Sequence, residues 1–409
     1  MSKAANGRSS IHRRADGHGW EGWVSLGTHP VTGRRWRKHV RGATKTEVAR
    51  KITQLEQQRH HGVAAVDEGA TVTGWLEAWL AGRAAAGLRP NSISAYSTDL
   101  KYVARSGVGR VRLRDLSPEY VEQVYAYVVA LPRAGAGSAA HLRRTLNAAL
   151  NAAVQRGHLS RNPVRLATVP RHDQPALEPY CTEEIARVLA AARRRRNGVR
   201  WSLALLGLRQ GEVLALRWTD VNLAAGELTI RHTLTWRRWR HGCPEVEGVQ
   251  SCGQQASRCQ HRHGGGPQLG PPKSAAGRRT ISIPAPVLAE LREHRSRQAA
   301  ERLAAGPRWH DREFVITSTT GGPVDRTSDR EDWHRVLTAA AVRRLRIHDL
   351  RHCAATALLV LGADSRVLLG IMGWTSMTLV QRYTHLVPDL RRDIAHRQTA
   401  LWAASEGEA

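Results

Sequence analysis

The stretch His348-Asp-Leu-Arg351-His352 tells the most about the C-terminal half of the chain. It is followed by an apolar run of helix-forming residues, which predicts a helix that begins near His348: Ala354, Ala355, Ala357, Leu358 and Leu359. His348 and Arg351 stand three positions apart, so both side chains project from one face of that helix and could reach the same phosphate group. Taken alone, an imidazole and a guanidinium at this spacing are weak evidence of a site.

Three further residues bracket this stretch. Tyr383 lies in the segment 373–385 and is one of two tyrosines after residue 176, the other being Tyr180. Upstream, Arg209 stands in Gly-Leu-Arg-Gln-Gly-Glu, directly before an apolar helical run. Lys273, in Pro-Lys-Ser, is the only lysine after position 101. Any chemistry in the C-terminal half that needs an ammonium group therefore has one candidate.

Charge and hydropathy narrow the class of protein. The 409 residues include 62 Lys and Arg against 35 Asp and Glu, a net charge of +27 with histidine neutral. Such an excess suits a polyanion such as nucleic acid, or an anionic membrane surface. Because nearly all the cations are arginine, a GC-rich genome would also produce it. No stretch approaches the roughly 18 consecutive apolar residues of a membrane span, and no signal peptide opens the chain, so we expect a cytoplasmic protein.

Residues 1–65 predict a small sheet followed by a helix. The runs 20–26 and 34–40 are strand-like and are joined by a turn rich in Pro and Gly. Thr44-Lys-Thr-Glu47 is a capping box that starts an amphipathic helix. Basic residues crowd the second strand, which suits a β-ribbon in a DNA groove or, alternatively, a charged edge strand protected from aggregation: Arg34, Arg35, Arg37, Lys38 and Arg41.

Residues 70–172 predict a bundle of four or five helices. Ser117-Pro118-Glu119 supplies a cap, a first-turn proline and an acid that favours the helix dipole. Another helix is expected from about Ser138 to Gly157. Residues 170–179 hold three prolines and should form a linker.

A third domain, residues 176–400, should be mainly helical with a small antiparallel sheet. Residues 227–231 and 279–283 both alternate polar with apolar side chains, so they should pair. An insert at about 234–272 would project from their tip. The predicted fold class is therefore α+β, mostly helical, with three domains: a small sheet plus helix, a helical bundle and a mixed, mainly α domain.

The insert carries three of the five cysteines, Cys243, Cys252 and Cys259, followed by His261 and His263. Three thiolates and one imidazole can hold a tetrahedral zinc ion, which would order so polar a segment. The spacing matches no tight CxxC knuckle, so a mobile, disordered loop is the alternative. An odd number of cysteines in a chain without a secretion signal argues against a disulfide framework.

Together these segments resemble the tyrosine recombinase, or phage integrase, family over nearly the whole chain. The resemblance implies an integrase whose residues 1–65 bind arm-type DNA, whose residues 70–172 bind core DNA, and whose residues 176–400 are catalytic. At the position where many members of the family carry a histidine, this chain has Trp374, whose indole N–H is also a donor toward phosphate. The catalytic set implied by the matching motifs is Arg209, Lys273, His348, Arg351, Trp374 and Tyr383.

The chemistry of these groups fits DNA strand transfer without a required cofactor. Arg209 and Arg351 can neutralise the charge that develops on a phosphodiester. Tyr383 would attack phosphorus to form a covalent 3′-phosphotyrosine, with His348 helping to remove its proton. Lys273 would protonate the leaving 5′ oxygen. By contrast, we expect His352 to be structural and Glu212 to orient Arg209.

The resemblance also implies partners. These are double-stranded DNA at core and arm attachment sites, a homotetramer on DNA in which a helix at 388–403 docks on a neighbouring protomer, and an excisionase or host architectural factor. No membrane partner is expected. Two other functions stay open: a DNA-binding regulator that keeps the fold without cutting, and a type IB topoisomerase that relaxes DNA rather than recombining it.

Overall fold

A computed structural model of the chain forms two compact units, within residues 1–174 and 175–409. Both units combine helices with small antiparallel sheets, which confirms the predicted α+β, mostly helical class. The boundaries of the three domains stay a prediction, and both the expected helix at 388–403 and Arg34 lie outside the described residues. The structure describes residues 10–28, 35–60, 69–172, 178–246 and 249–384.

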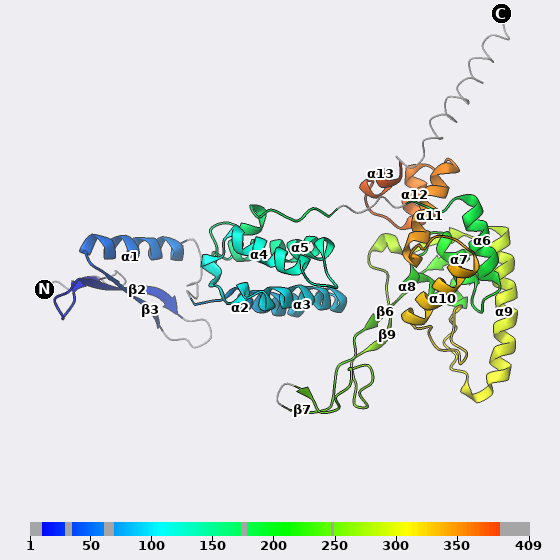
Figure 1. Ribbon diagram of the computed structural model, residues 1–409, viewed down its shortest axis with the longest axis horizontal. Helices are drawn as coiled ribbons and strands as arrows, with labels where there is room; N and C mark the ends of the chain where they lie inside the picture. Colours follow the sequence, from blue (N-terminus) through cyan, green and yellow to red (C-terminus); the bar gives the residue numbers. More distant parts are fainter. Residues whose placement is uncertain (1–9, 29–34, 61–68, 173–177, 247–248, 385–409) are drawn as a thin grey trace, which may run out of the picture. The chain divides into compact units, whose positions relative to one another are not determined.

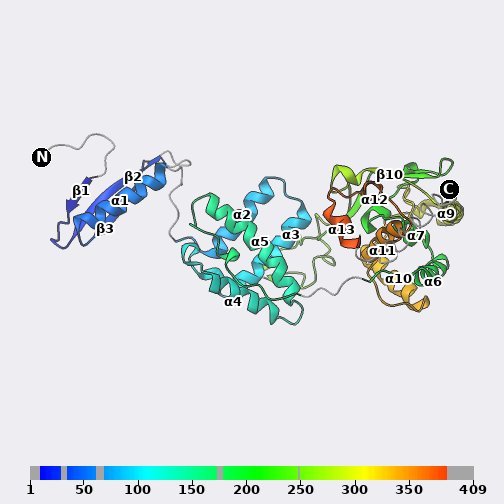
Figure 2. The ribbon, with the colours of Figure 1, turned by 90° about the horizontal axis from the view of Figure 1, so that it is seen from above.

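The first unit begins with a three-stranded antiparallel sheet that one helix covers (Figure 2). A small apolar core lies between them, formed mainly by Val24, Val40, Val48 and Ile52. Half of the predicted capping box is present: the Thr44 hydroxyl accepts the Glu47 N–H at 3.1 Å, whereas the Glu47 carboxylate accepts from the Ala43 N–H at 2.9 Å rather than from Thr44. The sequence did not predict β1, whose four residues are too few to show alternation. The elements are β1 (Ser10–Arg13), β2 (Trp20–Thr28), β3 (Arg35–Gly42) and α1 (Lys45–His60).

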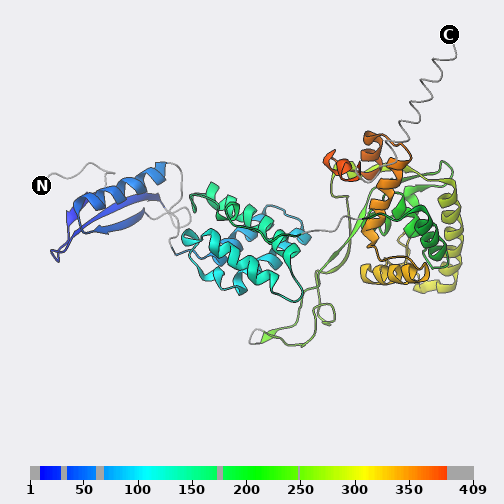
Figure 3. The same cartoon turned by 45° about the horizontal axis from the view of Figure 1, so that its top comes forward.

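Residues 69–172 form a helical bundle (Figure 3). The bundle has its own apolar core. Pro118 opens one helix, as its position after Ser117 predicted. The longest helix of this bundle buries Leu142, Leu146 and Leu150 along one face, as the helical period requires. The helices are α2 (Val72–Ala85), α3 (Pro90–Arg105), α4 (Pro118–Val129) and α5 (Ala136–Gln155).

The second unit packs helices around a small sheet (Figure 1). Strands β5 (Glu227–Ile230) and β10 (Arg279–Ser282) pair antiparallel as predicted, with Ile281 opposite Leu228, and β4 (Val221–Asn222) adds a third strand. Among the described residues, no helix is long and apolar enough to cross a bilayer. The helices are α6 (Thr182–Arg193), α7 (Val199–Leu205), α8 (Gln210–Val213), α9 (Ala285–Ala305), α10 (Arg326–Ala339), α11 (Ile347–Val360), α12 (Ser365–Met372) and α13 (Thr378–Thr384).

The insert leaves the body of this unit as a two-stranded ribbon (Figures 1 and 3). Strands β6 (Thr233–Arg237) and β9 (Gly266–Gly270) pair antiparallel, and a short hairpin of β7 (Glu245–Val246) and β8 (Val249–Gln250) lies beyond them. The expectation of a disordered loop is therefore wrong for the described part of the insert. Its glycines serve close packing, since a Cβ on Gly265 would stand 2.5 Å from the Trp239 backbone.

A buried ion pair ties three elements of the second unit together. Arg200 on α7 donates from Nε to Asp329 on α10 at 2.8 Å, and both side chains are 3% exposed. The other oxygen of Asp329 accepts from Gln210 Nε2 at 2.7 Å. Because Gln210 opens α8, this carboxylate also fixes the turn in which Arg209 stands.

We expect Asp329→Ala to destabilise the second unit by about 2–3 kcal/mol, because it removes the fully buried carboxylate that pairs with Arg200 and leaves only the partly exposed Asp332, 2.9 Å from Arg200 Nη2, to balance that charge. Urea unfolding followed by tryptophan fluorescence measures the loss, since Arg200 lies 3.8 Å from the centre of the Trp201 ring. Glu331→Ala, at an exposed position of α10, is the matched control and should change stability by less than about 0.5 kcal/mol. Equal stability of the two variants would contradict this account.

Candidate active site

Arg351 lies at the centre of the candidate site. It follows the first turn of α11, where Asp349 caps the helix by accepting the Arg346 N–H at 2.8 Å. Its side chain is buried, at 3% exposed, and its guanidinium donates to the backbone carbonyls of Gly207 and Met372. Burial, together with the nearby charge of Arg209, lowers the pKa of Arg351 to about 9. The group is still a cation at neutral pH, and an anion beside it would be stabilised.

Arg209 approaches the same place from the start of α8. Its Nη1 donates to Glu212 Oε1 at 2.7 Å, while its backbone N–H donates to Glu212 Oε2 at 3.0 Å. Its Nη2 reaches the Gly373 carbonyl oxygen at 3.4 Å. The side chain is 35% exposed, so it is oriented by Glu212 and still open to a ligand. This contact agrees with the orienting role expected for Glu212.

Arg279 on β10 is a member of the cluster that the sequence analysis did not select. It donates to Glu212 Oε2 at 3.0 Å and to the Gly207 carbonyl oxygen at 3.2 Å. Burial alone would raise the pKa of Glu212, but the charge of Arg279 and the Arg209 N–H outweigh it, so the net pKa lies below its ordinary value. The sequence held a signal that Arg279 would be buried: in a strand that alternates polar and apolar residues, Arg279 lies on the same face as the buried Ile281.

Tyr383 reaches this group from α13 of the same chain. The side chain is 4% exposed, and its ring stacks on Trp374 with centroids 5.4 Å apart and planes 13° apart. The Arg351 guanidinium lies 5.6 Å from the Trp374 ring centre, so the indole bridges arginine and tyrosine. The Tyr383 hydroxyl is hydrogen-bonded to Nδ1 of His352. This contact was not foreseen for His352, which we expected to be structural.

The two histidines of α11 lie next to each other. The ring centroids of His348 and His352 are 5.3 Å apart, in an edge-to-face arrangement. Although His348 is exposed, the surrounding protein lowers the pKa of its imidazole, first by restricting hydration and then through the charge of Arg351. Burial and then His348 lower the pKa of His352. Both rings are therefore neutral at neutral pH and can accept a proton.

Lys273 is exposed on the connection between β9 and β10. This connection passes close to the cluster, because a Cβ on Gly373 would stand 2.7 Å from the Ala276 carbonyl oxygen. Gly373 can lie there because it has no side chain and adopts a φ of 58°. Contacts through His352 and Trp374 join four of the other predicted residues: His348, Arg351, Trp374 and Tyr383. Arg209 is joined to them through the Gly373 carbonyl oxygen.

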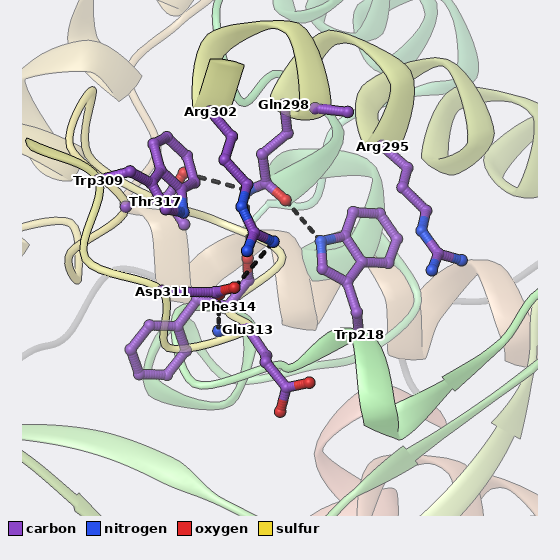
Figure 4. Close-up of a pocket in the computed structure, with 11 residues that line it drawn as sticks. Trp218, Arg295, Gln298, Arg302, Trp309, Asp311, Glu313, Phe314 and Thr317 are labelled. Atoms are coloured by element: carbon purple, nitrogen blue, oxygen red, sulfur yellow. Dashed lines mark hydrogen bonds and ion pairs between the residues drawn. The ribbon is translucent and has the colours of Figure 1, made fainter. Parts of the chain in front are cut away.

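A hollow of about 210 Å³ lies elsewhere in the unit, between α9 and residues 309–321 (Figure 4). None of the six predicted residues lines it. Its polar groups largely satisfy each other: the Trp218 indole N–H donates to Gln298 at 2.5 Å, and Arg302 pairs with Asp311 at 2.8 Å. Because few polar groups remain for a ligand, we place the candidate site at the arginine, histidine and tyrosine cluster instead.

Comparison with known proteins supports the fold described above. Residues 278–389 match the phage integrase family. An integrase of Saccharopolyspora erythraea is 36% identical, over 98% of both chains. The Tn1549 transposon integrase, solved in complex with a circular intermediate DNA, has a TM-score of 0.62 at 15% identity and covers 80% of this chain and 99% of its own. A lambda integrase tetramer bound to a Holliday junction has a TM-score of 0.53 at 17% identity, covering 90% and 96%.

We expect Glu212→Gln to lower the melting temperature of the second unit by roughly 6–12 °C. The amide keeps the shape but leaves buried Arg279 without its counter-charge, a loss of about 3 kcal/mol or more, and a unit of this size loses about 2–4 °C per kcal/mol. Differential scanning calorimetry measures the shift. Glu227→Gln, at an exposed position of β5, is the control and should melt within about 1 °C of the parent. If the Glu212→Gln variant also melted within about 1 °C of the parent, the Glu212 carboxylate would not hold the arginines in place.

Proposed function

The chain belongs to the phage integrase family of tyrosine recombinases, and we propose that it is a site-specific integrase that cuts and rejoins double-stranded DNA. It would act in the cytoplasm to integrate, and under other conditions excise, a phage or other mobile element. One observation carries the proposal: Tyr383 stacks on Trp374, which lies against the buried guanidinium of Arg351. A nucleophile and a cation that can bind phosphate are thereby brought to one place.

The arginines would stabilise the transition state at phosphorus. As a fifth ligand approaches, negative charge grows on the non-bridging oxygens, and guanidinium groups can bind it through paired hydrogen bonds. Among the described contacts, Arg351 donates to backbone carbonyls rather than to a carboxylate, so its charge is left for the phosphate. Arg209, held at the rim by Glu212, would supply the second guanidinium. The Trp374 indole N–H would be a further donor.

Proton transfer would proceed through the histidines and Lys273. With its own proton on Nε2, neutral His352 can accept the phenol proton at Nδ1 as the Tyr383 oxygen bonds to phosphorus. His348, edge-on to His352, would support this step rather than perform it alone. The P–O5′ bond breaks, and Lys273 would give the leaving oxygen its proton. Rejoining reverses these transfers when a 5′ hydroxyl of another strand attacks the 3′-phosphotyrosine, so no cofactor is required.

Two further surfaces suit the DNA backbone. On the face of the N-terminal sheet opposite α1, Trp23 is 45% exposed and stacks on His39 at 4.3 Å, with Arg37 and Arg41 exposed alongside. An aromatic and basic face of this kind fits a β-ribbon in a groove of arm-type DNA. By analogy with the DNA-bound Tn1549 and lambda integrases, residues 70–172 would bind core DNA, and four chains would assemble on two sites. An excisionase or a host architectural factor would control direction.

We expect the chain to form a covalent adduct with a nicked suicide duplex that carries the junction sequence adjoining its own gene, and Tyr383→Phe to form none. Denaturing electrophoresis of labelled DNA detects the adduct, and gel shift measures binding separately. Tyr180→Phe is the matched control: it loses one hydrogen bond, from the hydroxyl to the Arg343 carbonyl oxygen, and should keep the adduct. DNA binding without an adduct would indicate a regulator, whereas relaxed plasmid without recombinant product would indicate a topoisomerase.

The rate of adduct formation should hold steady from pH 8 to 7 and fall as the pH drops below the ordinary histidine value. The pKa of His352 lies below that value, so the imidazole stays neutral at pH 7 and loses its capacity to accept a proton only in acid. His352→Gln should slow single-turnover cleavage by about 10²–10⁴-fold with DNA affinity unchanged, and should remove the acidic fall. If His348→Gln removed that fall and His352→Gln did not, the base would be His348.

A further inference from the structure

The ribbon of the insert brings four metal-ligand side chains together outside the candidate active site. The potential ligand atoms of His241, Cys243, Cys252 and Cys259 all lie within 4.8 Å of one another. We propose that these four residues form a structural zinc site. The inference does not depend on the proposed recombinase activity.

The spacing of the ligand atoms fits a tetrahedral ion. Zinc bonds of about 2.3 Å to sulfur and 2.0–2.1 Å to nitrogen, at tetrahedral angles, place a sulfur and a nitrogen about 3.6 Å apart. Nδ1 of His241 lies 3.6 Å from Cys243 Sγ and 3.4 Å from Cys252 Sγ. These distances hold a nitrogen and two sulfurs around one point, with Cys259 as the fourth ligand.

The fourth ligand differs from the sequence expectation. We had expected His261 or His263 to complete the set, because both follow the cysteines. Both are exposed, and His263 instead pairs with Arg240 across the ribbon and bonds through Nε2 to the His241 carbonyl oxygen at 3.1 Å. The pairing of His263 with Arg240 fixes the segment that directly precedes Cys243. His241, in that segment, is therefore the histidine that lies by the cysteines. Gly242 permits the close approach, since a Cβ there would lie 2.2 Å from the His261 carbonyl oxygen.

The end of the ribbon has little else to hold it. Among the described residues, the hydrophobic clusters include none from 237 to 266. The apolar side chains of the β7–β8 hairpin, Val246 and Val249, are exposed rather than packed. By contrast, Cys259 is only 2% exposed, although its neighbours in the chain are open to solvent. A polar unit of this size without a core needs a metal or a disulfide to fold, and all five cysteines are free thiols.

The ligand set also defines the role of the ion. Three thiolates and one imidazole fill a tetrahedral shell and leave no open position for water, which is typical of structural rather than catalytic zinc. On binding, each thiol gives up its proton to the solvent. Zinc would thereby fix the end of a ribbon whose exposed basic side chains include Arg237, Arg238, Arg240, Arg258 and Arg262.

The test is the zinc content of the full chain, purified under reducing conditions with zinc present and any affinity tag removed. Mass spectrometry of the metals should find about one zinc per chain, as a single four-ligand site requires. His241→Ala and Cys243→Ser should lower this at least threefold. His261→Ala and Cys181→Ser are matched controls, a histidine and a cysteine outside the cluster, and should keep full occupancy. Less than about 0.3 zinc in the parent chain would overturn the proposal.

A second measurement separates loss of the site from general misfolding. Hydrogen exchange should speed up at least tenfold within residues 238–265 in His241→Ala or after chelation, while exchange in α7 and α11 stays unchanged. Unchanged exchange in the ribbon after complete zinc removal would show that the ion is not structural. A His261→Ala variant that lost zinc while His241→Ala kept it would overturn the assignment of the fourth ligand. Neither result depends on DNA cleavage.

Discussion

The turn from Gly207 to Arg209 holds the candidate site together, because one carbonyl oxygen in it accepts hydrogen bonds from two buried arginines. Arg351 and Arg279 both donate to the Gly207 carbonyl oxygen, so α11 and β10 converge on the same point. Gly207 has a φ of 90°, and a Cβ there would lie 2.7 Å from Met372 Sδ. Only glycine satisfies both conditions. The geometry of the site thus depends on a backbone position that performs no chemistry itself.

The described residues of the site carry more positive than negative charge. Arg209, Arg279 and Arg351 surround a single described carboxylate, that of Glu212. This excess raises the energy of the empty site and adds to burial, the main cause of the lowered pKa of Arg351. A phosphate would restore the balance, because it supplies the missing negative charge where burial makes the attraction strong. The buried pair of Arg200 and Asp329 illustrates the opposite design, in which each charge already has its partner.

Two regions of the second unit meet the demands of folding in different ways. Its body is held by an extensive apolar cluster, and the arginines of the site have backbone and carboxylate partners. The end of the ribbon, residues 237–266, has no member of such a cluster among its described residues and instead gathers sulfur and nitrogen ligands. In both places polar groups are buried only where a partner of matching chemistry is available.

Local patterns in the sequence were enough to predict much of this protein. Thr44 marks the start of α1 and the first-turn Pro118 that of α4, and alternation predicted that β5 pairs with β10, because each signal lies in consecutive residues. The motifs around Arg209, Arg351 and Tyr383 were also evident. Tertiary structure alone decided that Arg279 shares Glu212, that His352 contacts Tyr383, and that His241 rather than His261 or His263 lies by the cysteines. These contacts depend on how distant segments pass one another, and no spacing along the chain records that path.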